Sequence, residues 1–324
     1  MYLDSLRLSD VLFRSARLAS RIIRDSNALK ILSIIERGYD VSLNSDFRGL
    51  LTYAYINKVL SFLLLREPKH KLLRNLRLRL LRQRSSFLIH LKHVVEALDA
   101  CRIDYVIFKT LRPVPETPVD IDVLVESKDD AYSAITCLRR RFRVEIWDED
   151  RYSIGIRIPK FREYIDFYVE PHVADFVYLD SKALIRNRVC LHIDELGVEM
   201  LVPVPRPELE FCSILAHSMI KEGLVTLNDV ISLITYGLLS NSDKLAQWLS
   251  KFSLNVAYGE FFNVLEGDLP AKIGHGARFK VLASLLREKY AVSSLPYFIL
   301  GLGKRLNRII EQQKRVTYIR GLER

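Results

Sequence analysis

The amino-acid sequence predicts a mixed α/β protein, a class taken here to include α+β folds. A mixed sheet with flanking helices is expected in the middle of the chain, with helical regions on its N-terminal and C-terminal sides. Short segments that alternate apolar and polar residues, as strands do, are confined to the stretch from Tyr105 to Glu170. Amphipathic helical patterns occupy both ends of the 324-residue chain. A proline-rich junction at Val202–Leu209 separates the sheet from the second helical region.

These patterns divide the chain into three expected regions. Residues 1–84 form a basic helical lobe, residues 85–204 an α/β domain, and residues 205–324 a helical domain. A chain of this length has room for roughly two or three domains.

In the first region, apolar residues recur at helical spacing from Asp4 to Glu36 and from Phe47 to Leu65, with helix ends expected near Gly38 and Pro68. A helical lobe is the simplest interpretation. A second interpretation takes residues 31–40 and 52–64 as helices of a winged helix-turn-helix that binds DNA.

The segment Arg66–Arg84 is strongly basic. Its eight lysines and arginines are opposed only by Glu67, and leucines form a helical stripe among them. One interpretation is a surface helix with a solvated basic face. The other is an electrostatic track for a nucleic-acid backbone or a triphosphate, which the net charge of +10 favours without identifying a partner.

The middle region predicts an alternation of helices and strands. The expected helices are Ser85–Ala100 and Lys128–Arg141, and the expected strands are Tyr105–Thr110, Asp120–Val125, Phe142–Trp147, Tyr152–Ile158 and Glu163–Glu170. The expected helices of the last region are Leu209–Glu222, Leu227–Leu239, Asp243–Phe252, Ala277–Glu288 and Leu300–Gln313.

Asp120 and Asp122 lie two positions apart on one expected strand, so both carboxylates share one face of the sheet. Two carboxylates side by side repel each other, and a divalent cation relieves that repulsion. Asp166 lies on the polar face of a later strand, where it completes the acidic set of a two-metal site. Glu170 is the alternative for the third position.

At these residues the sequence resembles the nucleotidyltransferase superfamily of the DNA polymerase β type. The family pattern is a hydrophobic residue, Gly, then Gly or Ser, a spacer, and an Asp-x-Asp/Glu strand followed by a third acid. Here Phe108, Lys109 and Thr110 precede Asp120 and Asp122 by a spacer of nine residues. The likeness is greatest to a poorly characterised group whose first strand ends in Lys-Gly, and it extends from Ser85 to Leu239. In that group a later helix carries a His and a Lys, and an Asp follows; these correspond here to His217, Lys221 and Asp229.

The resemblance implies a Mg²⁺- or Mn²⁺-dependent transfer of a nucleoside monophosphate from a nucleoside triphosphate, ATP among the candidates, to an acceptor hydroxyl on RNA, protein or a small molecule. Its implied catalytic residues and metal ligands are Asp120, Asp122 and Asp166. Its implied nucleotide-binding residues are Lys109, Thr110, Arg112 and Lys221. An RNA or protein acceptor would dock through the basic N-terminal lobe.

Three alternatives stay open at this point. Thr110 stands where the family has Gly or Ser, which favours a catalytically weakened protein that acts as an antitoxin-like or nucleic-acid-binding partner. Lys109 has the alternative role of an ion-pair partner of the acidic cluster. His217 has the alternative role of a structural hydrogen bond to Asp229.

The sequence also predicts a cytoplasmic protein without membrane contact. Its longest apolar runs, Val59–Leu65 and Leu295–Leu302, are far shorter than the ~20 residues of a membrane span. The N-terminus has no uninterrupted apolar segment of the kind found in signal peptides. The four cysteines are widely spaced, which predicts reduced thiols and no zinc site.

Overall fold

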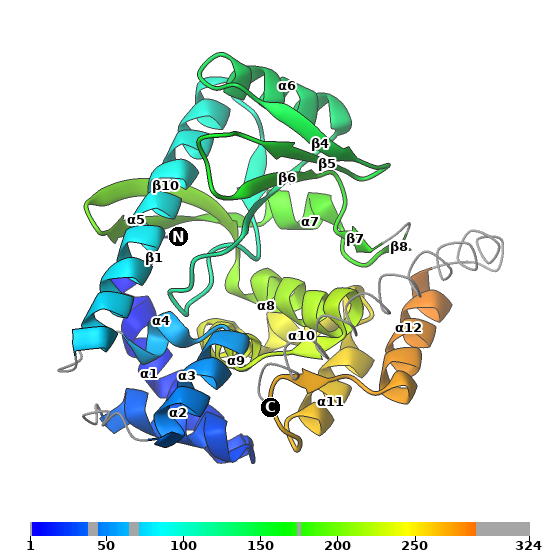
Figure 1. Ribbon diagram of the computed structural model, residues 1–324. Coiled ribbons are helices and arrows are strands. Elements are labelled where there is room, and N and C mark those ends of the chain that lie inside the picture. Colours follow the sequence, from blue (N-terminus) through cyan, green and yellow to red (C-terminus); the bar gives the residue numbers. More distant parts are fainter. Residues whose placement is uncertain (1, 38–44, 65–70, 174–175, 290–324) are drawn as a thin grey trace.

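The computed structural model describes residues 2–37, 45–64, 71–173 and 176–289. It confirms the predicted α/β class, with a mixed sheet between helical N-terminal and C-terminal regions (Figure 1). Among these residues, no helix combines the length and the apolar character needed to cross a membrane.

The N-terminal region contains four helices within the described ranges: α1 (Ser5–Ile22), α2 (Ser26–Arg37), α3 (Ser45–Ile56) and the short α4 (Leu60–Leu63). The pattern over Asp4–Glu36 is thus broken into two helices. The break occurs because the Asp25 carboxylate accepts the backbone N–H groups of Asn27 and Ala28 and so caps α2. The helix ends predicted near Gly38 and Pro68 lie outside the described residues.

The basic segment and the helix predicted after it form one continuous helix, α5 (Lys71–Ala100), which passes through the boundary predicted at residue 84. Its second half packs on the sheet through buried apolar residues, Phe87, Leu88, Leu91, Val94 and Leu98. Arg84 is buried and forms an ion pair with Glu195, so this arginine belongs to the protein interior rather than to a basic surface.

The central sheet has five strands in the order β2-β3-β6-β5-β4. Its strands and the helix between them are β2 (Tyr105–Ile107), β3 (Asp120–Val125), α6 (Lys128–Arg139), β4 (Glu145–Glu149), β5 (Ser153–Arg157) and β6 (Tyr164–Tyr168). Strands β3 and β6 are parallel and the other neighbours antiparallel. Ile121, Ile156 and Ile165 pack with α5 and α6 in one core on the first face of the sheet. The opposite face carries the polar side chains of β3 and β6.

A second sheet, of three strands, was not predicted. It consists of β1 (Tyr2–Asp4), β9 (Arg188–Glu195) and β10 (Val198–Pro205), with β9 and β10 joined by a tight turn at Leu196–Gly197 where both residues have positive φ. The interpretation of Val202–Leu209 as a plain junction is therefore wrong: it contains the end of β10 and the start of α8. Prolines are tolerated in β10 because it is an edge strand.

Shorter elements connect the sheets: β7 (His172–Val173), β8 (Phe176–Val177) and α7 (Ser181–Arg186). The C-terminal region comprises α8 (Pro207–Ala216), a π-helical turn η1 (His217–Glu222), β11 (Leu224–Val225), α9 (Leu227–Leu239), α10 (Ser242–Lys251), α11 (Asn255–Val264), β12 (Ala271–Lys272) and α12 (His275–Lys289). The predicted helix Leu209–Glu222 thus changes to π geometry at His217, and α11 was not predicted. The helix predicted at Leu300–Gln313 lies outside the described residues.

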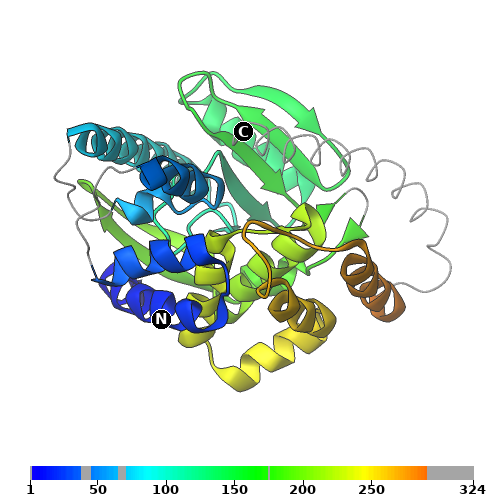
Figure 2. The same cartoon turned by 60° about the horizontal axis from the view of Figure 1, so that its bottom comes forward.

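The N-terminal helices pack against the C-terminal helices, although the sheet lies between them in the sequence. Figure 1 shows α1–α4 beside α9, and Figure 2 shows the same N-terminal helices, in blue, against the yellow-green C-terminal ones. The Asp25 carboxylate accepts the Tyr53 hydroxyl at 2.7 Å and the Leu269 N–H at 2.6 Å. The Asn57 amide oxygen accepts the Leu227 N–H at 3.0 Å. These buried bonds attach the N-terminal lobe to the helical domain.

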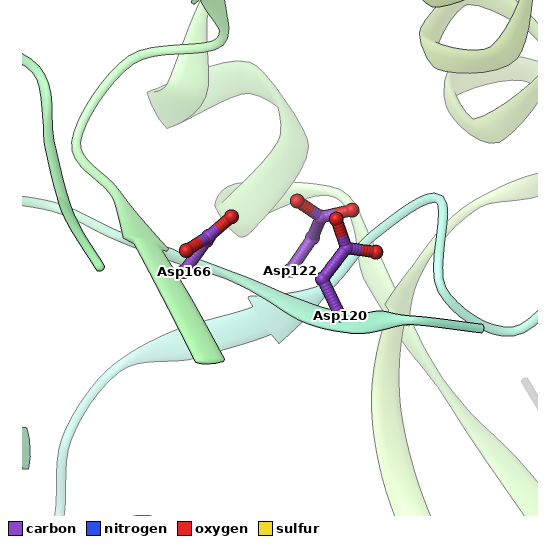
Figure 3. A group of neighbouring side chains, drawn as sticks. All are labelled: Asp120, Asp122 and Asp166. Carbon is purple, nitrogen blue, oxygen red and sulfur yellow. The ribbon is translucent and has the colours of Figure 1, made fainter. Parts of the chain in front are cut away.

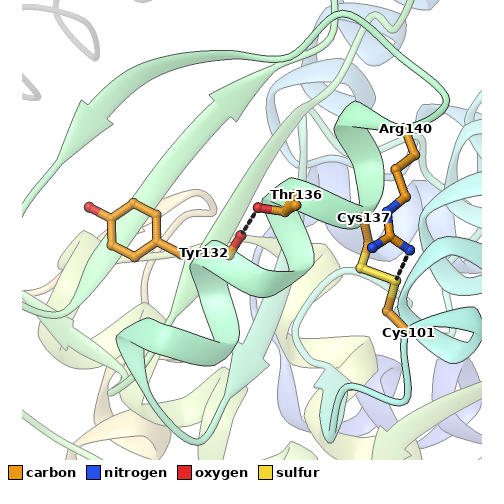
Figure 4. Close-up of a disulfide and its surroundings, with 5 residues drawn as sticks. All are labelled: Cys101, Tyr132, Thr136, Cys137 and Arg140. Carbon is orange, nitrogen blue, oxygen red and sulfur yellow. Dashed lines mark hydrogen bonds between the residues drawn. A yellow bond between two sulfur atoms is a disulfide. The ribbon is translucent and has the colours of Figure 1, made fainter.

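The prediction of reduced thiols is wrong for Cys101 and Cys137, which form a disulfide (Figure 4). Cys101 follows the end of α5 and Cys137 lies on α6, so the packing of the two helices brings their Cα atoms to 6.4 Å across 36 residues of sequence. No local motif signals such a pair. Disulfides are rare in the cytosol outside hyperthermophiles, so the cytoplasmic location stays a prediction that the redox state of this pair can test.

We expect the Cys101→Ser/Cys137→Ser variant to lose about 3–4 kcal/mol of unfolding free energy in urea denaturation, because the bridge closes a loop of 36 residues in the unfolded chain. Cys190→Ser is the matched control, since Cys190 is an exposed free thiol. Equal stability of the double variant and the oxidised wild type would contradict the role of the bridge.

Candidate functional site

Three carboxylates converge on the sheet face opposite α5 and α6 (Figure 3). Asp120 and Asp122 project from β3, and Asp122 is in register with Asp166 on the parallel strand β6. One oxygen of each carboxylate lies within 4.8 Å of the others. The two-residue period of the strands produces this cluster, because Ile121 and Ile165 point into the core on the other face. Their roles as metal ligands and catalytic residues stay predictions.

Glu170, the alternative third acid, lies elsewhere. Its carboxylate accepts the backbone N–H of Ser181 at the start of α7. The register of β3 and β6 therefore places Asp166, and not Glu170, beside Asp122.

The environment of the cluster penalises its negative charge. Burial, followed by repulsion from Asp122, raises the pKa of Asp120 to about 6. Burial, followed by repulsion from Asp122 and Asp120, raises the pKa of Asp166 to about 7. Lys109 and Lys221 offset part of this effect. Three hard oxygen ligands with excess negative charge fit a Mg²⁺ or Mn²⁺ ion.

Lys109 contacts the cluster directly. Its ammonium lies 3.4 Å from Asp122 Oδ1, and 4.4 Å and 4.9 Å from the ring centres of Phe108 and Tyr168. Burial lowers the pKa of Lys109, but the charges of Asp122 and Asp120 outweigh this effect and hold it above its usual value. Lys109 is therefore a charged ion-pair partner of the acidic cluster, as one of the two sequence interpretations expected.

The loop after β2 is held by a residue that the sequence did not single out. The Lys109 N–H donates to Glu210 Oε1 of α8 at 2.7 Å, and Lys109 takes the left-handed conformation with φ +61°. Burial is the main cause that raises the pKa of Glu210 to about 7. The only sequence signal for Glu210 is an acid among the buried apolar residues of α8.

Thr110 stabilises β3 from within the same loop. Its hydroxyl accepts the Asp122 N–H at 2.9 Å and donates to the Phe108 carbonyl at 3.3 Å. The side chain is buried, so the hydroxyl helps to position Asp122. Its predicted contact with a triphosphate stays a prediction.

Arg112 forms a buried ion pair with Asp229. Asp229 also completes a capping box with Thr226 at the start of α9. The suggested hydrogen bond between His217 and Asp229 is therefore wrong, because Asp229 faces Arg112 and Thr226 instead. The predicted nucleotide contact of Arg112 is untested, and the observed pair attaches the loop to α9.

The π-helical turn η1 contributes Lys221 and His217 to the surroundings of the cluster. The Lys221 ammonium lies 3.3 Å from the Tyr168 hydroxyl, and burial followed by the charge of Lys109 lowers its pKa. His217 lies 3.6 Å from Glu222, and burial with the nearby cations holds its pKa well below the usual range, so its imidazole is neutral. Single π-helical turns are frequent at functional sites.

Lys58, between α3 and α4, is a further cation that sequence analysis missed. Its charge acts on Asp120, His217 and Asp229. Asn228 donates to the Lys58 carbonyl at 2.8 Å, which holds this turn against α9. No sequence pattern indicates that Lys58 lies near the cluster, because it is 62 positions before Asp120 and approaches it only through the docking of the N-terminal lobe.

No protein-family model and no curated protein sequence matches the chain. Among solved structures, the chain is similar to the solution structure of the antibiotic-resistance factor ANT(2'')-Ia, with 15% identity and a TM-score of 0.37. The overlap covers 55% of this chain and 96% of that one.

We expect Asp166→Asn to stabilise the metal-free protein at pH 8. The folded-state pKa of about 7 lies above the usual value of 3.8 for an aspartate, so the ionised carboxylate costs stability once the pH has risen past both values. The gain should be on the order of 1–2 kcal/mol at pH 8, since neighbouring groups share part of the shift, and should shrink towards pH 4. Urea denaturation in EDTA at several pH values measures it.

Asp194→Asn, at an exposed position on β9, is the control and should follow the wild type at every pH. If Asp166→Asn is as stable as the wild type at both ends of the range, the three carboxylates do not repel one another as the structure implies.

Proposed function

We propose that this chain is a metal-dependent nucleotidyltransferase that moves a nucleoside monophosphate from a nucleoside triphosphate to an acceptor hydroxyl. The observation that carries the proposal is the convergence of Asp120, Asp122 and Asp166 within 4.8 Å, faced by Lys109 and Lys221. In this reaction the acceptor oxygen forms a bond to the α-phosphorus, the bond to the bridging oxygen breaks, and pyrophosphate leaves.

The chain's own residues support this chemistry as follows. Asp120 and Asp122 would hold Mg²⁺ or Mn²⁺ ions, with Asp166 as the third ligand. When bound, the ions neutralise phosphate charge and lower the pKa of the acceptor hydroxyl. Lys109 and Lys221 place positive charge beside the carboxylates, where the triphosphate would lie. Glu210 and Thr110 position the loop and the Asp122 backbone for this arrangement.

We extend the proposal to an RNA or protein acceptor at the basic face of α5. Lys71, Arg74, Arg79 and Arg82 are exposed on this helix. Arg66 and Lys69 lie outside the described residues, and Arg84 is buried. Exposed cations on one helix attract a polyanion and make its binding dependent on salt.

A second candidate is a binding protein that keeps the fold and has weak catalysis. The observation in its favour is that the Lys109 N–H and the Thr110 hydroxyl already have partners within the protein. A loop that lacks glycine and whose donors are occupied offers fewer groups to a phosphate.

Transfer of label from an α-labelled nucleoside triphosphate separates the two candidates. With Mg²⁺ or Mn²⁺ and RNA or protein acceptors, we expect incorporation by the wild type and a loss of at least about 100-fold in Asp120→Asn/Asp122→Asn, because the charge on the transferred phosphate is no longer stabilised. Asp194→Asn should retain activity. Equal background label in the wild type and the double variant would contradict the transferase.

Titration of Mn²⁺ by calorimetry tests the metal site without turnover. We expect the dissociation constant to fall by at least about tenfold from pH 5 to pH 8, because protons compete with the metal at carboxyls whose pKa values are about 6 and about 7. Asp120→Asn/Asp122→Asn should abolish the signal and Asp194→Asn should not. If Mn²⁺ binds equally well at both pH values and to the double variant, the ion binds elsewhere.

A further inference from the structure

The edge strand β4 contains a β-bulge at Trp147. Ile146 pairs with Ile156 and Asp148 pairs with Gly155, so no residue of β5 lies opposite Trp147. A bulge re-aims a side chain, and bulges are frequent beside active sites.

The indole of Trp147 lies over Gly155, next to the acidic cluster. A Cβ atom at position 155 would meet Trp147 Nε1 at 2.6 Å and Trp147 Cε2 at 2.9 Å, and Asp166 Oδ1 at 3.1 Å. Gly155 is also the register partner of Asp166. Because glycine has no side chain at this position, the indole can lie against the sheet next to Asp166.

Tyr164 extends this surface. Its ring centre lies 5.3 Å from that of Trp147, and the two ring planes are tilted by 55° to each other. Tyr164 is 41% exposed and Trp147 is 55% exposed. Tyr164 is in register with Asp120 on β3, so its side chain is on the same face of the sheet as the cluster. Two exposed aromatic side chains thus lie side by side and form an apolar surface that no other described segment covers.

Arg157 adds a positive charge at the same place. It is exposed and in register with Tyr164 on one side and with Glu145 on the other. Glu145 forms an ion pair with Arg143, and within the described ranges no carboxylate forms one with Arg157. The cations Lys109 and Lys221 approach the cluster from elsewhere: Lys109 follows β2, at the edge of the sheet opposite β4, and Lys221 lies on η1. The site thus has a cationic side near β2 and an aromatic side near β4.

We infer that Trp147 and Tyr164 form an aromatic platform for the terminal nucleobase of a single-stranded nucleic-acid acceptor. The indole of Trp147 stacks on the base, the tilted ring of Tyr164 lies against its edge, and Arg157 binds its phosphate. As an acceptor site, this inference rests on the proposed transferase function. A nucleobase presents a flat face to the indole and is joined to a phosphodiester that suits a guanidinium. Stacking there would bring the terminal sugar hydroxyl towards Asp166, while the triphosphate lies on the cationic side.

Fluorescence of Trp147 tests the platform in the full chain. The chain has two tryptophans, so Trp248→Phe leaves Trp147 as the sole indole. A short single-stranded oligoribonucleotide is titrated in EDTA without nucleotide, beside the same oligomer with an abasic 3′ end. We expect quenching by the intact oligomer and about tenfold weaker binding of the abasic one.

Variants in β4 and β5 supply the controls, with binding measured by anisotropy of a labelled oligomer. Trp147→Ala should weaken binding about tenfold. Gly155→Ala should weaken it as well, because the new methyl group displaces the indole. Ile146→Ala should bind like the wild type, since Ile146 is an exposed neighbour in the same strand. Its register partner, Ile156, packs in the core on the other face of the sheet.

Equal binding by Trp147→Ala and Ile146→Ala, or equal quenching by the abasic oligomer, would overturn the platform. Quenching by a tyrosine-containing peptide but not by the oligomer would overturn the nucleic-acid assignment in favour of a protein acceptor. The assay needs neither metal nor turnover. If stacking is lost but label transfer is intact, only this inference is wrong. If stacking occurs without label transfer, the proposed function is wrong, and with it the role of the platform as an acceptor site.

Discussion

The hydrogen bond from the Lys109 backbone N–H to the Glu210 carboxylate joins the sheet that carries the acidic cluster to the helical domain behind it. It holds Lys109 in a left-handed backbone conformation that costs a non-glycine residue roughly 1–2 kcal/mol. In that conformation the lysine ammonium lies against the rings of Phe108 and Tyr168 and reaches Asp122. The Arg112–Asp229 ion pair and the hydrogen bond from Tyr236 to the Leu111 carbonyl attach the rest of the loop to α9.

This attachment explains how three carboxylates coexist in a mostly buried place. Each region of the chain supplies a cation: Lys58 from the N-terminal lobe, Lys109 from the loop after β2, and Lys221 from η1. Their charges only partly offset burial and repulsion, because the pKa values of Asp120 and Asp166 stay above their usual range. Repulsion among the carboxylates thus persists in the protein alone, and a divalent cation bound to them would relieve it.

Sequence analysis identified the acidic cluster because it depends on a local rule. Residues two apart on a strand share a face, so the pairing of Asp120 and Asp122 follows as soon as the strand forms. For the third acid the strand pattern leaves both Asp166 and Glu170, and the register of β6 against β3 decides for Asp166. Glu210, Lys58 and the Trp147 bulge escaped prediction, because each acquires its neighbours through packing or pairing that no local period encodes.

The sequence by itself determined the mixed α/β class, the helical regions at both ends and the shared face of Asp120 and Asp122. These features follow from the spacing of apolar and polar residues along short segments, and that spacing is complete in the sequence. The tertiary structure decided the left-handed Lys109, the Cys101–Cys137 bridge and the cations around the cluster. Each of these joins segments tens of residues apart, and only the packing of helices on the sheet sets which distant residues meet.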